Sequence, residues 1–368
     1  MLQHPRRVLF VTSFHPGASG YIGAGEAICA GSLQRLRAEA DRVDVLCVAP
    51  GYQRKNAQVD SWCDSYTEVT SSRGSTLLAI LLHVFSGAWI APWFFTRTSP
   101  AAIAALQRLI KEKQPTELWI DFPSSLGFVA HVGALPVSYF VHDVVSQKVA
   151  RSPLKRFVYP WVRRVEASLL RRVRDCYLLS EKDGALLADL GFSGKAEVWG
   201  VQGTAVGEVD NARAINDVLE QFGSGPNLVF FGNMGRPENS RSVIHFALFN
   251  WWRVRREFPQ AVFWVLGLGP GPVLRALSRV LPGFNVVGPV DDPAPAFQAA
   301  TLCVAPLLFG AGVKIKVLQM LDAGATVMST DVGAEGIAPS ERLIIVDIQH
   351  MASRIIEFLN GAKTAAPH

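Results

Sequence analysis

Short apolar runs, each about the length of one β-strand, alternate along the whole chain with stretches long enough to hold a helix. Because the runs are apolar at successive positions rather than at every second one, they predict strands of parallel sheets that helices cover on both faces. We expect strands in the first half at residues 7–13, 43–48, 117–122, 136–142, 176–180 and 197–201, and in the second half at 228–232, 262–267, 284–287, 302–306, 326–330 and 343–346.

One segment, residues 202–226, interrupts this alternation with many Gly, Asn, Asp and Ser residues, which are typical of loops. The chain has 368 residues, enough for two domains of ordinary size. We therefore expect an α/β protein of two doubly wound, Rossmann-like domains, residues 1–202 and 227–368, joined by a linker at 203–226 and facing across a cleft. Ligands of such sheets bind beyond the carboxyl ends of the strands, so residues that follow strands are the first candidates for a site.

The cysteines and the N-terminus indicate the compartment. Five cysteines lie far apart without a C-x-x-C pair, so we expect neither disulfides nor a zinc site. At the N-terminus two arginines precede an apolar run only as long as a strand, and no small-residue cleavage site follows, so we expect no signal peptide. These features predict a cytoplasmic protein.

Three glycine loops follow predicted strands in the second half. Gly310-Ala311-Gly312 precedes a predicted helix, whose N-terminal N–H groups favour an anion such as a diphosphate. Lys314 and Lys316 come next, in the predicted first turn, where a cation is unfavourable unless an anion offsets it. The alternative is two solvated lysines on an exposed turn. The other loops contain Gly269 and Glu335, and each alone usually marks only a tight turn.

In order and spacing, residues 230–337 resemble the donor-binding domain of bacterial nucleotide-sugar glycosyltransferases with the GT-B fold, of the group 1 or family 4 type. The resemblance rests on linked motifs, which read FFGNMGRPENSRSVIHF, VLGLGPGP and FGAGVKIKVLQMLDAGATVMSTDVGAEGI. It implies sugar transfer from a nucleotide-sugar donor, with retention of anomeric configuration and no metal or other cofactor. The donor-binding residues that it implies are Gly23, Gly25, Asn233, Arg236, Gly269, Gly312, Lys314, Lys316 and Glu335.

The sequence also departs from the family pattern. Gln319 stands where the family usually has a glutamate that contacts the donor, and Ala311 where it has a second acidic residue. The family's arginine and lysine after the first strand of this domain align with Asn233 and near Asn239. The alternative to an enzyme is therefore a non-catalytic scaffold that binds a sugar nucleotide or a partner glycosyltransferase. No motif in the sequence specifically indicates a nucleotide-sugar epimerase with the same fold.

A glycine-rich loop with Gly23 and Gly25 follows the first predicted strand. Ile28 stands where the last glycine of G-x-G-x-x-G would be, which disfavours a dehydrogenase. In the GT-B relatives a loop at this place faces the donor phosphates; the alternative is a flexible connector. Glu26, which opens the next helix, and Asp121, which follows a strand, are candidates for contacting the acceptor.

His142 and Asp143 end another predicted strand, where a His-Asp pair is common in the family. We expect catalytic roles for both and for Gln319. His142 can bond a sugar hydroxyl or shuttle a proton. Asp143 is the candidate base if the reaction inverts the anomeric centre, and its alternative role is to cap the following segment.

Residues 76–95 carry no formal charge, and 15 of these 20 residues are apolar. The run is long enough to span a membrane, but a span would separate two predicted strands from the rest of their sheet. We expect a buried helix pair, or an interfacial hairpin with Trp89 and Trp93 at headgroup level.

Residues 148–174 support the membrane interpretation with nine basic residues and one acid, interleaved with aromatic side chains. Arg163, Arg164, Arg171 and Arg172 are the expected contacts with an anionic leaflet. A solvated helix face and nucleic acid are the alternatives, and the nearby apolar run favours the membrane. We therefore predict a peripheral enzyme on the inner face of the cytoplasmic membrane that glycosylates a lipid-linked or polysaccharide acceptor of cell-surface glycan, such as exopolysaccharide, capsule or lipopolysaccharide.

Overall fold

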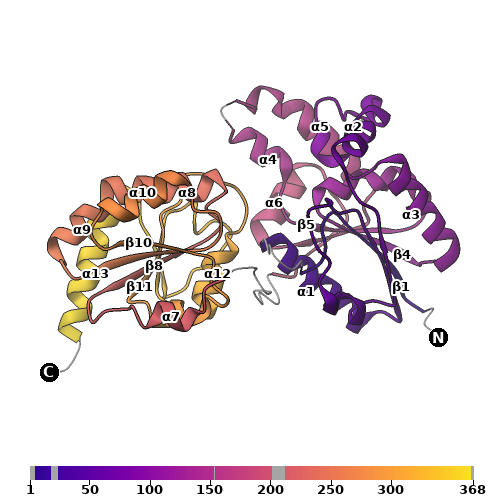
Figure 1. Ribbon diagram of the computed structural model, residues 1–368. Helices are drawn as coiled ribbons and strands as arrows, with labels where there is room; N and C mark the ends of the chain where they lie inside the picture. Colours follow the sequence, from indigo (N-terminus) through magenta and orange to yellow (C-terminus); the bar gives the residue numbers. More distant parts are fainter. Residues whose placement is uncertain (1–4, 18–23, 153, 201–211, 366–368) are drawn as a thin grey trace. The chain divides into compact units, whose positions relative to one another are not determined.

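The computed structural model describes residues 5–17, 24–152, 154–200 and 212–365. The chain divides into two compact units, Met1–Gly207 and Glu208–His368, which we call unit 1 and unit 2. Each unit is built around one sheet of parallel strands, as the alternating sequence predicts (Figure 1).

The sheet of unit 1 has the strand order β3-β2-β1-β4-β5-β6-β7. Six of these strands coincide with predicted ones, while β3 was not predicted because its sequence SYTE is half exposed and holds no apolar run. The chain moves outward in both directions from the neighbours β1 and β4, so the switch point of this doubly wound sheet lies between them. The strands are β1 (Arg7–Thr12), β2 (Arg42–Cys47), β3 (Ser65–Glu68), β4 (Glu117–Asp121), β5 (Val137–Val141), β6 (Asp175–Leu178) and β7 (Lys195–Val198).

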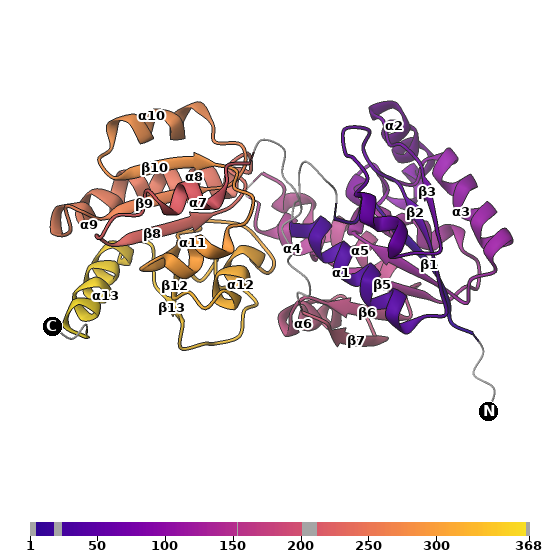
Figure 2. The same ribbon diagram turned by 60° about the horizontal axis from the view of Figure 1, so that its bottom comes forward.

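Helices cover both faces of this sheet (Figures 1 and 2). Local sequence fixes where they begin: Ser99 caps α3 by accepting from the Ala102 N–H, and Pro100 occupies the first turn, where a missing N–H is harmless. Side chains of α3 and α5 pack with Leu9 and Val11 of β1 into one apolar core. The helices are α1 (Ala24–Glu39), η1 (Ala57–Ser61), α2 (Arg73–Leu82), η2 (Val84–Ser86), η3 (Pro92–Phe94), α3 (Pro100–Lys113), η4 (Pro123–His131), α4 (Val145–Ala150), η5 (Arg156–Val158), α5 (Tyr159–Leu170) and α6 (Glu181–Asp189).

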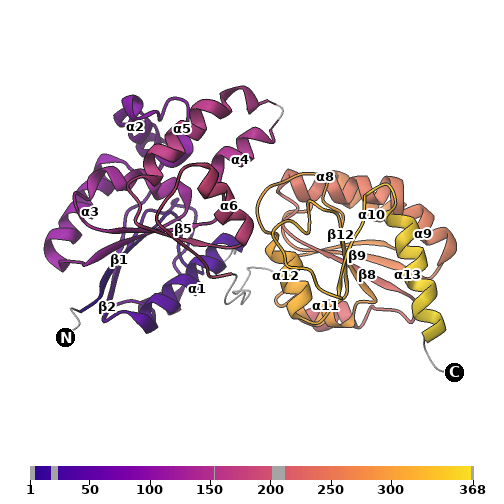
Figure 3. The same cartoon turned by 180° about the vertical axis from the view of Figure 1, so that it is seen from behind.

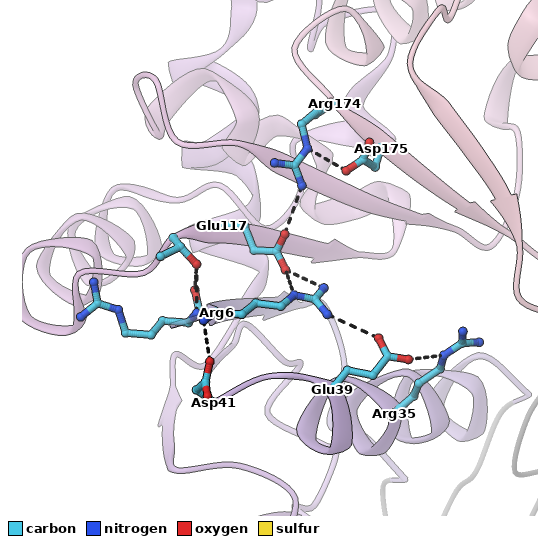
Figure 4. Close-up of polar contacts among 9 residues, drawn as sticks. Arg6, Arg35, Glu39, Asp41, Glu117, Arg174 and Asp175 are labelled. Atoms are coloured by element: carbon cyan, nitrogen blue, oxygen red, sulfur yellow. Dashed lines mark hydrogen bonds and ion pairs between the residues drawn. The ribbon is translucent and has the colours of Figure 1, made fainter. Parts of the chain in front are cut away.

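An ionic network ties together the amino ends of the central strands of unit 1 (Figure 4). The buried carboxylate of Glu117 on β4 accepts from Arg6 Nε at 2.9 Å and from an Arg174 guanidinium nitrogen at 3.2 Å. Arg6 also reaches Glu39 of α1, and Arg174 donates to Asp175 at 2.7 Å. The network lies at the edge opposite to the carboxyl ends, so it supports the sheet rather than a ligand site.

Unit 2 has the strand order β10-β9-β8-β11-β12-β13, with its switch point between β8 and β11. Alternate residues of its strands face two separate apolar cores, one under α8, α9 and α13 and one under α7, α11 and α12 (Figure 3). All six strands confirm predicted ones. The elements are α7 (Ile215–Leu219), β8 (Asn227–Phe231), α8 (Pro237–Phe246), the π-helical turn η6 (Ala247–Trp251), α9 (Trp252–Glu257), β9 (Val262–Leu266), α10 (Pro272–Val280), β10 (Phe284–Gly288), α11 (Ala294–Ala299), β11 (Leu302–Ala305), α12 (Ile315–Asp322), β12 (Val327–Ser329), β13 (Leu343–Ile345) and α13 (Met351–Ala365).

The predicted linker, 203–226, is too long at its C-terminal end. Residues 215–219 form helix α7, whose Ile215 and Val218 are buried in unit 2. Phe222 stacks on Trp264 of β9, with ring centroids 4.9 Å apart. Sequence reasoning missed this helix because it has only five residues, too few to give a periodic apolar pattern among the surrounding polar residues.

Candidate functional site

The loops that follow β8 and β9 lie against each other in unit 2. A Cβ on Gly267, whose φ is +118°, would meet the Gly232 carbonyl oxygen at 2.0 Å, and a Cβ on Gly269 would meet the Gly235 nitrogen at 3.0 Å. The loops after β11 and β12 meet in the same way, since a Cβ on Gly333 would lie 3.0 Å from the Ala305 carbonyl oxygen. Glycine is therefore required for these close backbone approaches at the carboxyl edge of the sheet.

Lys314 is the N-cap residue of α12, two positions after Gly312, whose φ is +75°. It is buried, with its ammonium group donating to the Gly312 carbonyl oxygen and lying 3.7 Å from a carboxylate oxygen of Glu335. The lysine thus joins the loop after β11 to the loop after β12. The alternative of two solvated lysines is wrong, because burial of Lys314 removes it from solvent.

Lys316 extends from α12 to the start of α8. Its ammonium group donates to Asn239 Oδ1 and lies 4.9 Å from the centroid of the Phe230 ring. A Cβ at Gly232 would come within 3.0 Å of the same nitrogen. Burial, followed by repulsion from Lys314 and Arg236, lowers the pKa of Lys316 to about 7.

The other predicted donor-site residues lie around the two lysines. Gln319 is one turn after Lys316 on α12 and so shares its helix face. Arg236 is exposed at the N-cap of α8. Asn233 serves the loop itself: its Oδ1 accepts from the Gly235 N–H at 2.9 Å, and its carbonyl accepts from Asn239 Nδ2 at 2.7 Å. The structure therefore uses Asn233 and Asn239 to shape the loop that holds Lys316.

In unit 1, β4 and β5 place Asp121 and His142 side by side at the carboxyl edge. His142 Nε2 and Asp121 Oδ1 are 2.5 Å apart, and Asp121 is fully buried. The other carboxylate oxygen of Asp121 has no hydrogen-bond partner among the described residues. The ring of Phe122 stacks on His142 with centroids 4.0 Å apart and planes within 4°, while the Phe122 backbone has a φ of +74°. Such a left-handed non-glycine residue is characteristic of a constrained site.

The first turn of α1 covers this pair. A Cβ at Gly25 would meet a Phe122 ring carbon at 2.8 Å and His142 Nδ1 at 3.9 Å. Glu26 is buried and accepts from Gln53 Nε2 at 3.1 Å. The structure thus brings Gly25, Glu26, Asp121 and His142 together at the carboxyl edge of the sheet. The sequence predicted a site at this edge, formed by residues that follow strands. Gly23 lies outside the described residues.

Asp143 differs from its sequence prediction. It forms an ion pair with Lys148, and it does not cap α4. The first N–H groups of α4 are instead satisfied by the buried carboxylate of Glu166, which accepts from Val145 at 2.8 Å and Ser146 at 2.9 Å. The capping interpretation is therefore wrong, because Glu166 on the neighbouring α5 reaches these amides. Sequence reasoning missed Glu166, since its partners are about twenty residues away.

The family comparison decides the nature of unit 2. Residues 225–361 match the family model described as "Glycosyl transferases group 1". Over these residues unit 2 is similar to a group 1 glycosyltransferase domain. Its glycine loops and paired lysines are the motifs on which the sequence resemblance rested. Among curated proteins, no sequence matches the chain.

Solved structures show a likeness in fold over nearly the whole chain. Anabaena HepE in complex with UDP is 13% identical, with a TM-score of 0.66 over 97% of this chain and 91% of that one. Sucrose-phosphate synthase from Thermosynechococcus elongatus is 13% identical, with a TM-score of 0.67 over 98% and 90%. WaaG, a glycosyltransferase involved in lipopolysaccharide biosynthesis, is 16% identical, with a TM-score of 0.61 over 97% and 91%. The chain has the GT-B fold.

Of the predicted membrane residues in unit 1, Trp89 follows η2 and Trp93 lies in η3, whereas the four arginines lie on α5 or directly after it. Large apolar side chains are exposed in two segments. Six lie at residues 77–89 (Leu77, Leu78, Leu81, Leu82, Phe85 and Trp89), and three lie at residues 154–161 (Leu154, Phe157 and Trp161). A Cβ at Gly87, which follows η2, would meet Val165 of α5 at 2.5 Å, so the segment after α2 contacts α5. We call this set the α2–α5 surface. None of the helices that the structure describes is both long and apolar enough to cross a membrane.

Some of the residues predicted as membrane contacts are exposed, and others contact the rest of unit 1. Trp89 is 67% exposed, but Trp93 packs partly against the core, with the Lys155 ammonium group 5.2 Å from its ring centroid. Arg164, Arg171 and Arg172 are exposed. Arg163 donates to Asp189 of α6, and with Arg164 it lines a shallow hollow of about 300 Å³ on α5.

Proposed function

We propose that the protein transfers a sugar from a nucleotide-sugar donor to a lipid-linked or polysaccharide acceptor in the synthesis of cell-surface glycan. The observation that carries the proposal is the meeting of glycine loops and two lysines at the β8–β11 switch point of unit 2, where doubly wound sheets bind nucleotides. HepE, a solved structure with the same fold, is described with UDP and with UDP-glucose, which supports a uridine nucleotide as the first donor to test.

Each part of unit 2 has a role in this proposal. The diphosphate lies at the N-terminus of α12, where loop N–H groups and the ammonium groups of Lys314 and Lys316 stabilise the charge of the leaving group. Gln319 contacts the sugar or ribose hydroxyls as a neutral donor and acceptor of hydrogen bonds. Family resemblance supports retention of configuration. It also supports a reaction without a metal, since the cationic side chains of Lys314 and Lys316 offset the negative charge of the diphosphate.

The residues of unit 1 act on the acceptor side. Because His142 directs Nε2 to Asp121, its Nδ1 is left to receive a hydrogen bond from a sugar hydroxyl. If the reaction inverts the anomeric centre, the Asp121–His142 pair is a better base than Asp143, which is engaged with Lys148. Glu26 supplies a second carboxylate at the same edge.

The α2–α5 surface supports the proposed acceptor class. Exposed apolar side chains next to Arg164, Arg171 and Arg172 suit the interface of an anionic membrane, with the protein bound on its cytoplasmic face. A lipid-linked acceptor would be presented at that interface.

Ligand-induced thermal shift with a panel of nucleoside diphosphates and their sugar conjugates tests the donor site. A specific ligand at 100 times its Kd should stabilise the native state by about 2.7 kcal/mol. Product formation with a membrane extract as acceptor source then tests transfer. If no nucleotide stabilises the protein, the proposal fails.

A second candidate is a non-catalytic scaffold that binds a sugar nucleotide or a partner glycosyltransferase. The observation that favours it is the neutral pair Ala311 and Gln319, where the family has acids. Nucleotide binding without transfer is the result that would support this candidate.

A further inference from the structure

The ammonium group of Lys316 is held inside unit 2 by neutral partners. Among the described residues, no carboxylate oxygen lies within the 4.0 Å of an ion pair. Asn239 accepts through Oδ1, and its Nδ2 donates to the Asn233 carbonyl at 2.7 Å, so the amide is fixed in orientation. The Phe230 ring provides the other contact, 4.9 Å away. These partners position the ammonium group without neutralising it.

The charges around Lys316 come from three elements. Arg236 and Glu238 stand at the start of α8, and Lys314 stands at the N-cap of α12. Glu335, in the loop after β12, is paired with Lys314 at 3.7 Å. Burial has the largest effect on Lys316 and lowers its pKa to about 7; Lys314 and Arg236 act in the same direction, and Glu238 opposes them. Near neutral pH the unbound site therefore holds this proton only part of the time.

We propose that Lys316 binds the diphosphate of the donor in its protonated form only, so that binding takes up one proton from the solvent. The inference rests on the proposed function, because it assumes a nucleoside diphosphate at the β8–β11 switch point. The proton passes from the solvent to Nζ, and the phosphate oxygens supply the counter-charge that the protein does not. No covalent bond changes apart from this N–H bond.

Two consequences follow for the affinity. Below pH 7 the lysine is already charged, so the affinity is insensitive to this group. Above pH 7 each unit of pH reduces the affinity by up to tenfold, because the proton must be added before the anion is bound. The site thus couples nucleotide binding and release to the local pH.

Calorimetric titration with UDP at pH 8, in two buffers of different ionisation enthalpy, counts the protons directly. At pH 8 the terminal phosphate of UDP, as a phosphomonoester with a second pKa of about 6, is already ionised. Proton uptake therefore reports on the protein. We expect close to one proton per site for the unmodified chain, and an affinity that falls more than tenfold between pH 7 and pH 9.

Two variants and a control sharpen the test. Lys316→Arg keeps a permanent positive charge, so it should bind UDP without proton uptake and with a flat affinity from pH 7 to pH 9. Lys316→Met, which is used if the arginine does not fold by circular dichroism, should bind more weakly and also without uptake. Lys195→Met removes an exposed lysine of β7 and should leave the proton count unchanged.

The outcomes separate this inference from the proposed function. If UDP binds to the unmodified chain without proton uptake, or if Lys316→Arg shows the same uptake, the inference is overturned and the donor site stands. If UDP and the other nucleoside diphosphates fail to bind even at pH 6, the proposed function itself is overturned.

Discussion

His142 and Asp121 form a buried pair across neighbouring strands, with His142 Nε2 2.5 Å from Asp121 Oδ1. The carboxylate fixes the orientation of the imidazole and leaves Nδ1 next to the first turn of α1. We expect Asp121→Asn to lower kcat/KM for sugar transfer at least tenfold, equivalent to about 1.4 kcal/mol of transition-state stabilisation, while UDP affinity remains unchanged. Steady-state transfer assays and calorimetry measure the two quantities.

Asp143→Asn is the matched variant for this pair, since the structure engages Asp143 with Lys148 at the surface. It should reduce kcat/KM less than Asp121→Asn. A larger loss in Asp143→Asn would contradict the assignment of the Asp121–His142 pair and restore Asp143 as the base.

Gln319 decides between enzyme and scaffold. Its amide can bond a hydroxyl but cannot offset the positive charge that develops on a sugar ring. We expect Gln319→Ala to slow single-turnover product formation with the fold intact, and Gln319→Glu to retain or increase it. Nucleotide binding with no transfer in any form, including Gln319→Glu, would instead identify the protein as a scaffold.

The α2–α5 surface should bind anionic liposomes. Neutralising Arg164, Arg171 and Arg172 together should reduce co-sedimentation at least tenfold, because each well-placed cation contributes about 1 kcal/mol. Added salt should have the same effect, as the Debye length is about 10 Å at 0.1 M. Arg163 is kept because it also binds Asp189.

The control removes the same charge elsewhere in unit 1, by neutralising Arg108, Lys111 and Lys195, which are all exposed. If this triple variant loses as much liposome binding as the other, general net charge rather than the α2–α5 surface explains the interaction. If neutral and anionic vesicles bind equally, only the apolar side chains anchor the protein.

Glu117 should stabilise the sheet of unit 1. Glu117→Ala leaves Arg6 and Arg174 without their shared buried partner, so we expect a loss of about 2 kcal/mol in the free energy of unfolding. Glu39→Ala, which removes a more exposed partner of Arg6, should cost less than about 1 kcal/mol. Urea denaturation measures both, and equal losses would rule out a special role for the buried carboxylate.

Lys316 should destabilise the ligand-free protein. Its folded pKa of about 7 lies below the ordinary value of 10.5, so the unfolded chain binds more protons between these values and stability rises with pH in that window. Lys316→Met should therefore raise the melting temperature most at pH 7 and below, with a gain that shrinks toward pH 10. Lys195→Met serves as the control and should show no such gain; a gain in Lys316→Met that is independent of pH would exclude this mechanism.

Much of the fold was predictable from the sequence because buried parallel strands need apolar residues on both faces. Twelve predicted strands correspond to observed ones, and the glycine loops after β9, β11 and β12 were found from their position after these runs. The edge strand β3 and the short helix α7 escaped prediction, since each has too few apolar residues to give a periodic signal.

The sequence by itself determined the two doubly wound sheets, the resemblance of unit 2 to group 1 glycosyltransferases and the residues that stand at strand ends, because period and spacing are local properties of the chain. Only the tertiary structure decided which of these residues meet. In the folded chain His142 pairs with Asp121 and not with its sequence neighbour Asp143. Lys316 likewise contacts Asn239, which is 77 positions away in the sequence. The physical reason is that hydrogen bonding and burial depend on strand order and helix packing, which bring together side chains from distant parts of the chain.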